Sequence, residues 1–596
     1  MTRLAQGVFA LLVLATAAAF FGAQKLKTAP PVVLAFRLSS DSISPNGDGR
    51  FEREEITFRL KRSELIDVAV VDQRGDDVRE LASGVSLSAY KTIPTLTWNG
   101  RDSAGKVVPD GLYRIRVRLR REGRSLVVPQ SFRVDTTPPK VTVISIGPSR
   151  GSGPEILPRA DDKPARIRIN TGARDGRVLI FRTWPLPSEL VATVPIPDRS
   201  SATSWDGLGK DGKSVKPGTY LAVAQRRDSA GVLGSSVELD SEGLPRTVYG
   251  RRLPGRGGIT VRPLAVQPPL VASQGKSPVS IKVAPTRRRF SWTLSRLGAS
   301  PSRKGTSSRA TVRFRPPSKR SQLYLFSAKQ GEDRVSAPVA VDDAAKHPVL
   351  VVLPLITWQG RNPVDDDGDG EPNLLSTGGP AKLSRVLGTP LPQGFAAQER
   401  PIMQWLEKAH HRYDLTTDYA LATGGASQLA GHSGVLLAGE TVWLPARLAQ
   451  RLRRFVNGGG TLVEAGVDSL LRGVTLTRAG QLVDPLPPAT SDIFGSSLAP
   501  QRKGSFDITS GKDSIGLFEG TSGLFSNYDV IEQTTSTGKG KTVASAVSGD
   551  GAVVIVAFRV GRGLVIRYGL PQLPSRLTTD PDVEGLIERS WQLLSR

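Results

Sequence analysis

The stretch "WNGRDSAGKVVPDGLY", residues 98 to 113, decides the fold of the first half of the chain, because it returns as "WDGLGKDGKSVKPGTY" at residues 205 to 220. Both copies set a tryptophan and a tyrosine 15 residues apart, with glycines 2, 7 and 13 residues after the tryptophan. Glycine adopts the positive φ angles of tight turns, and the segment "LYRIRVRLR" that follows alternates apolar and polar residues as a half-buried strand does. The repeat therefore predicts two β-sandwich domains.

The same residues resemble the core of the immunoglobulin-like domain of the flagellar hook-capping (FlgD-type) family. The likeness covers about residues 40 to 140 and 141 to 240. It implies an Ig-like fold and modules that act as spacers or adhesive units. Pro138 and Pro139 stiffen the linker between the two copies.

Length and pattern predict a chain of several domains. At 596 residues the protein exceeds the size of a single hydrophobic core, and about four domains are expected. The predicted segments are a signal or membrane anchor (1–29), a FlgD-type sandwich (30–140), a second Ig-like sandwich (141–244), a basic β-rich domain (245–345) and an α/β domain (346–596).

The N-terminus "MTRLAQGVFALLVLATAAAFFGAQKLKTAPP" contains an apolar run from about Gly7 to Ala23. Such a run predicts a segment that enters or crosses a membrane. Two interpretations stay open, an uncleaved N-terminal anchor and a cleaved signal peptide. Both predict an extracytoplasmic protein, anchored to the cell membrane in the first case and secreted in the second.

The pattern changes after about residue 347, where apolar runs alternate with amphipathic segments. The predicted strands are 349–356, 434–438, 461–465, 552–558 and 564–568, and the predicted helices are 401–411, 445–457 and 582–594. Uninterrupted apolar strands alternating with helices are typical of a parallel sheet covered on both faces. We therefore expect an α/β domain at the C-terminus.

Four motifs in this region, "TWQGRN" (357–362), "GVLLAG" (434–439), "RRFVNGGGTLV" (453–463) and "GRGLVIRYGLP" (561–571), carry a second resemblance. They resemble the class I glutamine-amidotransferase-like fold, and more closely the C-terminal domain of the N,N-dimethylformamidase large subunit. The likeness covers about 347–596 and implies a flavodoxin-like α/β domain. It also implies a cysteine nucleophile or an iron bound by tyrosine and glutamate. The chain has no cysteine, which excludes the first, and the iron ligands have no matched positions here.

The acidic loop "NPVDDDGDGEPN", residues 362 to 373, interrupts a chain of formal net charge +25. Asp365, Asp367, Asp369 and Gly370 follow the start of a calcium-binding EF-hand loop, although Ser376 stands where the twelfth-position glutamate belongs. Calcium binding through Asp365, Asp367 and Asp369, an exposed acidic turn, and a catalytic role remain open for this loop.

Two further groups are candidate sites. Open α/β sheets bind ligands beyond the carboxyl ends of their strands, so we predict ligand contacts for Thr357, Trp358, Gln359 and Asn362. The segment from Arg287 to Arg320 holds 11 Lys/Arg and no acid, and Arg287, Arg288 and Arg289 begin it. That cluster is either an anion-binding surface or a solvated strand face.

Three functions follow from these features. The first is a non-enzymatic cell-envelope protein with stalk modules and a degenerate amidotransferase-like head that binds a ligand or partner. The second is an extracytoplasmic amide or glycan hydrolase with its site at the strand ends. The third is an anion-binding protein whose partners are cell-wall polymers or lipid headgroups, and nucleic acid is not an expected partner.

Overall fold

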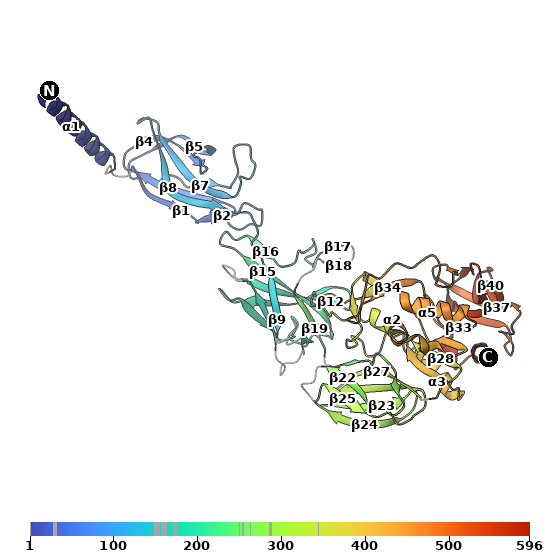
Figure 1. The fold of residues 1–596 in the computed structure, drawn as a ribbon. Coiled ribbons are helices and arrows are strands. Elements are labelled where there is room, and N and C mark those ends of the chain that lie inside the picture. The colour runs from blue at the N-terminus through green and yellow to red at the C-terminus, as the bar shows by residue number, and fades with distance from the viewer. Residues whose placement is uncertain are drawn as a thin grey trace.

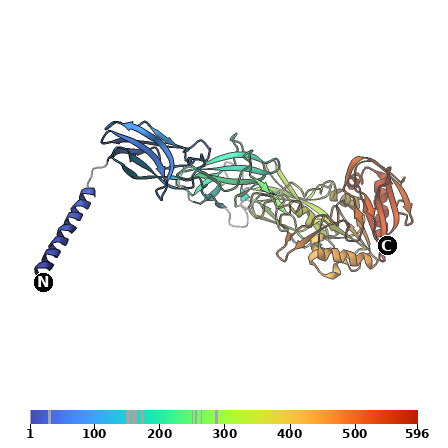
Figure 2. The ribbon, with the colours of Figure 1, turned by 90° about the horizontal axis from the view of Figure 1, so that it is seen from above.

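The computed structural model describes residues 2–27, 32–147, 155–156, 164–170, 176–248, 251–252, 256–262, 264–284, 289–343 and 345–596. Figures 1 and 2 show an elongated molecule in which the N-terminal helix α1 (Thr2–Lys27) projects from a row of β-domains. The C-terminal domain lies at the far end, beside the third β-domain.

The first domain has two sheets around one core, with strand orders β1-β3-β6 and β2-β8-β7-β4-β5. Alternate side chains of β4, "ELIDVAVV", point into this core. Its strands are β1 (Val33–Leu38), β2 (Ser42–Ile43), β3 (Glu54–Leu60), β4 (Glu64–Val71), β5 (Asp77–Leu87), β6 (Leu96–Trp98), β7 (Gly111–Leu119) and β8 (Arg124–Val134).

The second domain repeats this plan with strand orders β14-β11-β9 and β10-β19-β15-β12-β13, and β16 also pairs with β15. The boundary expected at 244/245 precedes β19, which hydrogen-bonds to β15 and completes the second sheet. The strands are β9 (Val143–Gly147), β10 (Glu155–Ile156), β11 (Ala165–Ile169), β12 (Gly176–Trp184), β13 (Glu189–Ile196), β14 (Ala202–Trp205), β15 (Gly218–Arg227), β16 (Leu233–Ser235), β17 (Thr247–Val248), β18 (Arg251–Arg252) and β19 (Gly258–Val261).

The two sequence repeats have the same local structure. Trp98 Nε1 donates to Arg101 O at 2.8 Å, and Trp205 Nε1 donates to Leu208 O at 2.9 Å. The tyrosine hydroxyl of each repeat donates to the carbonyl four residues before it, at 2.7 and 2.6 Å. The ring centroids of each Trp–Tyr pair lie 5.4 and 5.5 Å apart. Each pair buries large aromatic area while its polar atoms stay hydrogen-bonded.

The third domain also has two sheets, with strand orders β20-β22-β25 and β21-β27-β26-β23-β24, around its own core. The rings of Trp292, Phe314 and Phe326 stack with one another inside it. The strands are β20 (Ala265–Gln267), β21 (Ser273–Gln274), β22 (Val279–Ala284), β23 (Phe290–Arg296), β24 (Pro301–Ser307), β25 (Thr311–Phe314), β26 (Gln322–Gln330) and β27 (Asp333–Asp342).

The C-terminal domain is built on a nine-stranded sheet of order β30-β28-β31-β33-β42-β41-β40-β37-β38. The first five strands are parallel and the remaining four are antiparallel. The strands of this domain are β28 (Val349–Leu353), β29 (Ala381–Lys382), β30 (Asp414–Thr417), β31 (Gly434–Leu437), β32 (Trp443–Pro445), β33 (Thr461–Glu464), β34 (Arg472–Leu476), β35 (Gln481–Val483), β36 (Ser497–Leu498), β37 (Arg502–Asp513), β38 (Leu524–Ile531), β39 (Thr534–Ser536), β40 (Lys541–Ser548), β41 (Val553–Val560) and β42 (Gly563–Tyr568).

Short helices accompany this sheet and carry its connections. They are α2 (Leu355–Gly360), α3 (Glu399–Lys408), α4 (Asp418–Thr423), α5 (Ala446–Asn457), α6 (Leu573–Arg576), α7 (Pro581–Leu594) and the 3₁₀ helices η1 (Leu375–Thr377) and η2 (Ala426–Leu429). The predicted helices at 401–411, 445–457 and 582–594 correspond to α3, α5 and α7. Asp580 caps α7 by accepting hydrogen bonds from Asp582 N and Val583 N.

The expected fold class, with Ig-like domains and a flavodoxin-like α/β domain, is wrong. Strands make up 44% of the structure and helices 13%, so the chain is predominantly β. Of the apolar runs that suggested a parallel α/β domain, four lie in the parallel part of the large sheet, and the run at 552–558 forms the antiparallel strand β41. Other antiparallel strands, such as β37, were not predicted because they expose most of their side chains and contain no apolar run.

The expected membrane anchor is also wrong. Within the described residues, no helix, α1 included, is long and apolar enough to cross a bilayer. The predicted location, anchored to the cell membrane by this helix, is therefore withdrawn.

Hydrogen bonds and ion pairs connect consecutive domains. Asp48 of the first domain pairs with Arg227 of the second at 3.0 Å. The backbone of Gly258 in the second domain donates to Gly368 O of the C-terminal domain at 2.9 Å. The third domain joins the C-terminal domain more extensively, and Leu387 of the latter even packs into the core of the former.

Candidate anion-binding site

The acidic loop lies where the second and C-terminal domains meet. Thr183 of the second domain donates to Gly370 O at 2.6 Å. Both carboxylate oxygens of Asp365 accept backbone hydrogen bonds from inside the loop, from Gly368 N at 2.6 Å and Gly370 N at 2.9 Å. Burial, with the nearby charges of Asp369 and Asp367, raises the pKa of Asp365 to about 7. The loop therefore joins two domains.

The calcium candidates of this loop are close together. One carboxylate oxygen each from Asp365, Asp367 and Asp369 lies within 4.8 Å of the other two. Asp365 is buried and Asp367 is exposed, so a cation would reach the cluster from the Asp367 side. Ser376, at the twelfth position, lies in η1. The three oxygens are hard ligands of the kind that calcium prefers, although calcium takes about six to eight oxygen ligands.

The four strand-end candidates form part of the interior. Thr357, Trp358 and Gln359 lie in α2, and each is at most 3% exposed, as is Asn362. Thr357 Oγ1 accepts from Val442 N at 3.0 Å. The Asn362 side chain donates to Gln359 Oε1 at 2.8 Å, and its Oδ1 accepts from Gly388 N. The side chains of Thr357, Gln359 and Asn362 therefore serve internal hydrogen bonds, and the Trp358 side chain interacts with the buried Glu399 carboxylate.

A buried ionic cluster lies near the carboxyl ends of the central strands. Arg567 donates to Glu464 at 2.7 Å and to Asp492 at 2.5 Å, and all three side chains are at most 2% exposed. Burial raises the pKa of Glu464 to about 7, although the charge of Arg567 opposes this shift. A polymer or peptide substrate does not reach groups this deeply buried, which disfavours a hydrolase site here. The sequence signal for the cluster is a charge at the end of two apolar runs, "TLVEAG" and "LVIRYG".

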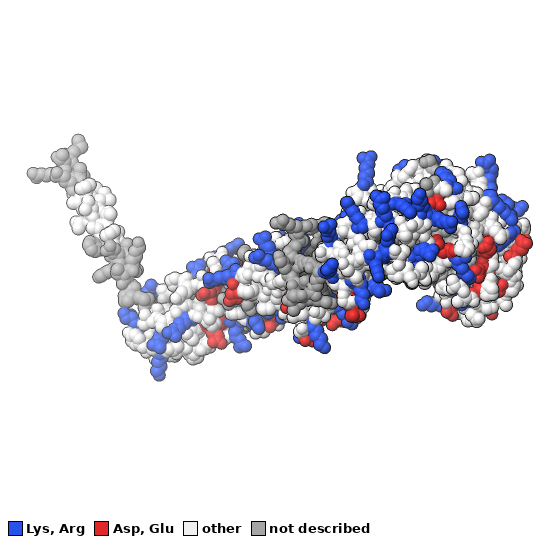
Figure 3. All heavy atoms as spheres, turned by 90° about the horizontal axis from the view of Figure 1, so that it is seen from below, with Lys and Arg blue, Asp and Glu red and all other residues white. Residues whose placement is uncertain are grey.

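The basic segment lies on the third domain. Arg287 and Arg288 fall outside the described residues. Arg289 is exposed and donates to Thr306 Oγ1 at 3.1 Å. In the view from below, Lys and Arg side chains gather over the third domain (Figure 3). Exposed members on β24 and β25 are Arg303, Lys304 and Arg313.

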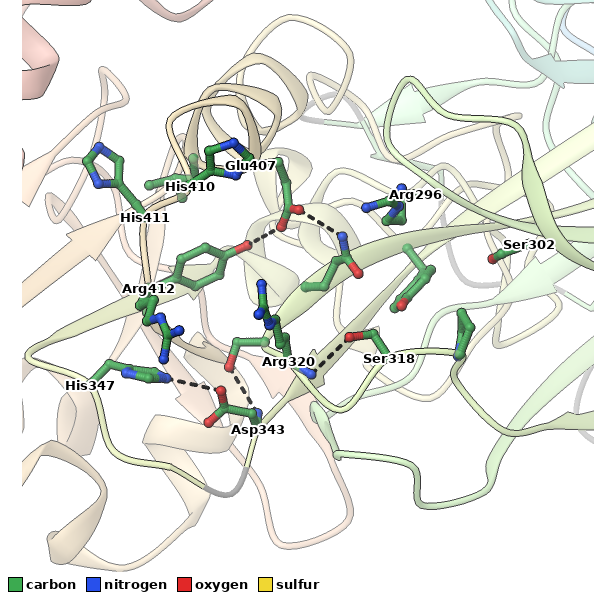
Figure 4. A pocket seen from close by; sticks show the side chains of 16 residues that line it. Arg296, Ser302, Ser318, Arg320, Asp343, His347, Glu407, His410, His411 and Arg412 are labelled. Atoms are coloured by element: carbon green, nitrogen blue, oxygen red, sulfur yellow. Dashed lines mark hydrogen bonds and ion pairs between the residues drawn. The ribbon is translucent and has the colours of Figure 1, made fainter.

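A pocket of about 590 Å³ lies between this basic domain and the C-terminal domain (Figure 4). The third domain contributes Arg296, Ser302, Ser318, Arg320 and Tyr324 among its lining residues. On the side of the C-terminal domain, the pocket is lined by the end of α3, the residues that follow it, and the link between the two domains. These lining residues include Asp343, His347, Glu407, His410 and Arg412.

Three arginines of the pocket have no partner. Within the described chain, the guanidinium groups of Arg296, Arg320 and Arg412 neither pair with a carboxylate nor donate a hydrogen bond. All three are exposed. Arg296 and Arg320 belong to the third domain, and Arg412 belongs to the C-terminal domain (Figure 4). A guanidinium is always charged and presents donors in a fork that matches carboxylate and phosphate oxygens.

The carboxylates of the pocket are already hydrogen-bonded. Glu407 accepts from the Tyr413 hydroxyl at 3.0 Å and from Gln322 at 2.8 Å. Asp343 lies 3.0 Å from His347 Nε2. None of these contacts uses an arginine of the pocket, so the donors of the three guanidinium groups remain available for an anionic ligand.

The histidines after α3 have different roles. His410 is exposed at the rim, and its φ of 58° ends the helix in a left-handed conformation. The ring of His411 instead stacks on Trp591 at 4.5 Å between centroids, and its Nε2 lies 2.9 Å from Glu588. The sequence did not single out Arg412, because only the tertiary fold brings it to the basic segment.

Comparisons with known proteins leave the family open. No protein-family model and no curated protein matches the sequence. A β-galactosidase from Bacillus circulans sp. alkalophilus is similar over 32% of this chain and 26% of its own, at 15% identity and a TM-score of 0.24. The exo-β-1,4-mannosidase Op5Man5 from Opitutaceae bacterium strain TAV5 is similar over 42% and 36%, at 13% identity and a TM-score of 0.26.

PorZ, a bacterial surface component of the type-IX secretion system of Porphyromonas gingivalis, is similar over 17% of this chain and 11% of its own, at 18% identity and a TM-score of 0.12. The chain thus spans about a third or less of the length of these three structures. These likenesses assign no family. At such TM-scores they carry no argument about fold or function, and the terms Ig-like, amidotransferase-like and transmembrane find no support.

Proposed function

We propose that this chain is a binding protein that holds an anionic ligand in the pocket between its third and C-terminal domains. The observation that carries this proposal is the convergence on one pocket of about 590 Å³ of Arg296, Arg320 and Arg412, three cations with no partner among the described residues. A guanidinium group gains charged hydrogen bonds when a ligand supplies the opposite charge.

The proposed ligand is a polymer with repeated phosphate or carboxylate groups. Exposed basic residues continue outside the pocket along β24 and β25, at Arg303, Lys304 and Arg313. One end of a polymer would fill the pocket and the following units would contact this basic face. Because the contacts outside the pocket are exposed, the affinity falls as salt concentration rises, since the Debye length shrinks to about 10 Å at 0.1 M.

Binding of polyphosphate and poly-glutamate to the full chain tests this proposal, with neutral dextran as the uncharged probe. The variant that combines Arg296→Ser, Arg320→Ser and Arg412→Ser is expected to bind at least about tenfold more weakly, because each charged hydrogen bond contributes about 1.5 to 3 kcal/mol. The matched control combines Arg124→Ser, Arg453→Ser and Arg478→Ser, three exposed arginines elsewhere that carry the same total charge. Equal losses in both variants would show a net-charge effect and reject the pocket.

A further inference from the structure

We propose a second site, for a divalent transition-metal cation such as Zn²⁺ or Mn²⁺, where Asp343, His347 and Asp414 meet. One ligand atom from each residue, a carboxylate oxygen or an imidazole nitrogen, lies within 4.8 Å of the other two. This inference does not depend on the anion-binding function, because none of the three unpaired arginines belongs to the set.

The fold brings these residues together from three segments. Asp343 directly follows β27, His347 lies in the link before β28, and Asp414 begins β30. β28 and β30 are parallel neighbours, so the link and the start of β30 lie at the same edge of the sheet. The site is thus at the amino ends of these strands, on the edge opposite the one that the sequence analysis favoured.

Hydrogen bonds already orient the three side chains. Ala345 N donates to one oxygen of Asp343 at 2.8 Å, and the other oxygen lies 3.0 Å from His347 Nε2. The backbone N–H of His347 donates to Asp414 Oδ1 at 3.2 Å. The side chains of Asp343 and His347 are 17% and 12% exposed, so they are largely buried but still reach the pocket.

A second histidine contacts one of the proposed metal ligands without belonging to the ligand set. His432 Nε2 lies 2.9 Å from Asp414 Oδ2, and the side chain of His432 is 3% exposed. Its Nδ1 is buried without a partner in the described chain. A histidine that hydrogen-bonds to a ligating carboxylate fixes the orientation of that ligand. Two of the four histidines in the sequence, His347 and His432, therefore both contact Asp414.

The donor set indicates the kind of metal. One imidazole and two carboxylates suit zinc, manganese or iron, whereas calcium and magnesium prefer oxygen ligands alone. Two carboxylates also neutralise a divalent charge. Three protein ligands leave an open coordination position, as in catalytic zinc sites, and Asp343 and His347 line the pocket that a water or ligand oxygen would enter (Figure 4).

Arg412 is the charge that opposes a cation here. Figure 4 shows its side chain beside His347. Because Arg412 is exposed, solvent screens its repulsion of a metal ion. An anion bound to Arg412 would remove that repulsion and could also supply the missing ligand.

Zn²⁺ titrated calorimetrically into the metal-stripped full chain tests the site, with Co²⁺ absorbance as an independent report of the ligand set. His347→Ala is expected to abolish specific binding, and His432→Ala to weaken it by about 10- to 100-fold, the usual effect of losing such a supporting partner. His410→Ala, which removes a histidine from the same pocket outside the ligand set, is the matched control and should bind as the unmodified chain does.

Equal affinity in the His347→Ala and His410→Ala variants, or no Zn²⁺ binding by the unmodified chain, would overturn the proposal. Asp343→Asn, which keeps the shape of the side chain, replaces His347→Ala if the latter does not fold, and it too should lose binding. Polyphosphate binding measured with EDTA present separates the two proposals. Loss of the metal site alone leaves that binding in place.

Discussion

Gly100 and Gly105 lie in the same repeat, but a methyl group would meet different surroundings at the two positions. Both have positive φ angles, 68° and 81°. A Cβ at Gly100 would lie 2.5 Å from Pro45 Cγ, whereas at Gly105 it would meet nothing within 4 Å. Gly105→Ala should therefore cost only the left-handed strain, about 1 to 2 kcal/mol.

Gly100→Ala should cost about 1 to 3 kcal/mol more, because the rigid ring of Pro45 cannot move away from an added methyl group. Hydrogen exchange of the amides in β3 and β7, compared between the two variants, measures the difference in unfolding free energy of the first domain. Equal protection in both would contradict the role given to Pro45.

Glu399 gives the C-terminal domain a pH dependence. Burial raises its pKa to about 8 from an ordinary value of 4.5, and the charge of Glu440 adds to the shift. The folded state therefore holds a proton that the unfolded state has lost between about pH 4.5 and pH 8, so stability falls as pH rises through this range. Glu399→Gln cannot ionise and should make the melting temperature less dependent on pH between 5.5 and 8. Glu371→Gln is the control, and an equal flattening there would contradict the assignment.

At the scale of single residues, the sequence predicted the structure where a residue type has one typical structural role, as glycine has in a tight turn. Trp98 and Tyr113 recur with their glycines, and the turns they imply are present. Glu399 and Arg412 could not be singled out, because burial and the approach of distant segments give them their properties. Nothing in their neighbours along the chain marks them.

The acidic loop is an element whose metal binding can be tested directly. We expect millimolar Ca²⁺ to raise the melting temperature of the chain, because the three carboxylates repel one another without a cation and the affinity range for such loops is about 10⁻⁴ to 10⁻³ M. Asp367→Asn should remove the response. Mg²⁺ at the same concentration is the control, since its strict octahedral geometry fits the loop poorly. No shift with Ca²⁺ would leave the loop as a structural turn.

Elements with strong patterns were predictable and polar strands were not. The apolar runs at 434–438 and 461–465 correspond to β31 and β33, and the amphipathic segment at 445–457 to α5. β24 and β37 expose most of their side chains, so their sequences lack the alternation that reveals a strand. Their pairing with neighbouring strands, which sequence does not show, makes them part of a sheet.

One residue without a side chain lies tightly packed in the contact between the second and C-terminal domains. A Cβ at Gly258 would lie 2.1 Å from Asp365 Oδ2 and 2.6 Å from Gly370 N, although its φ is not in the left-handed region. Gly258→Ala should therefore weaken the contact by about 1 to 3 kcal/mol without straining its own backbone. Small-angle scattering should report a larger radius of gyration. Gly549→Ala, where nothing lies within 4 Å, is the control and should leave the radius unchanged.

The pocket itself could be derived only from the whole molecule. The basic segment was visible in the sequence, but Arg320 and Arg412 reach one cavity because the third domain packs against α3 and the residues that follow it. Within the C-terminal domain, the pairing of the parallel strands β28 and β30 places His347 near Asp414. Contacts between residues this far apart in sequence carry no local signature.

The dependence of the second domain on the acidic loop has a consequence for synthesis on the ribosome. Leu221 packs against Gly370, and Gly257 and Gly258 donate to Gly368 O, yet even β19, the later of the two strands involved, is translated about 100 residues before the loop. At roughly 5 to 20 residues per second, this nascent domain waits about 5 to 20 s for its partner. During that interval an apolar side chain and two backbone N–H groups face the solvent, and a chaperone or a neighbouring nascent chain could bind there first.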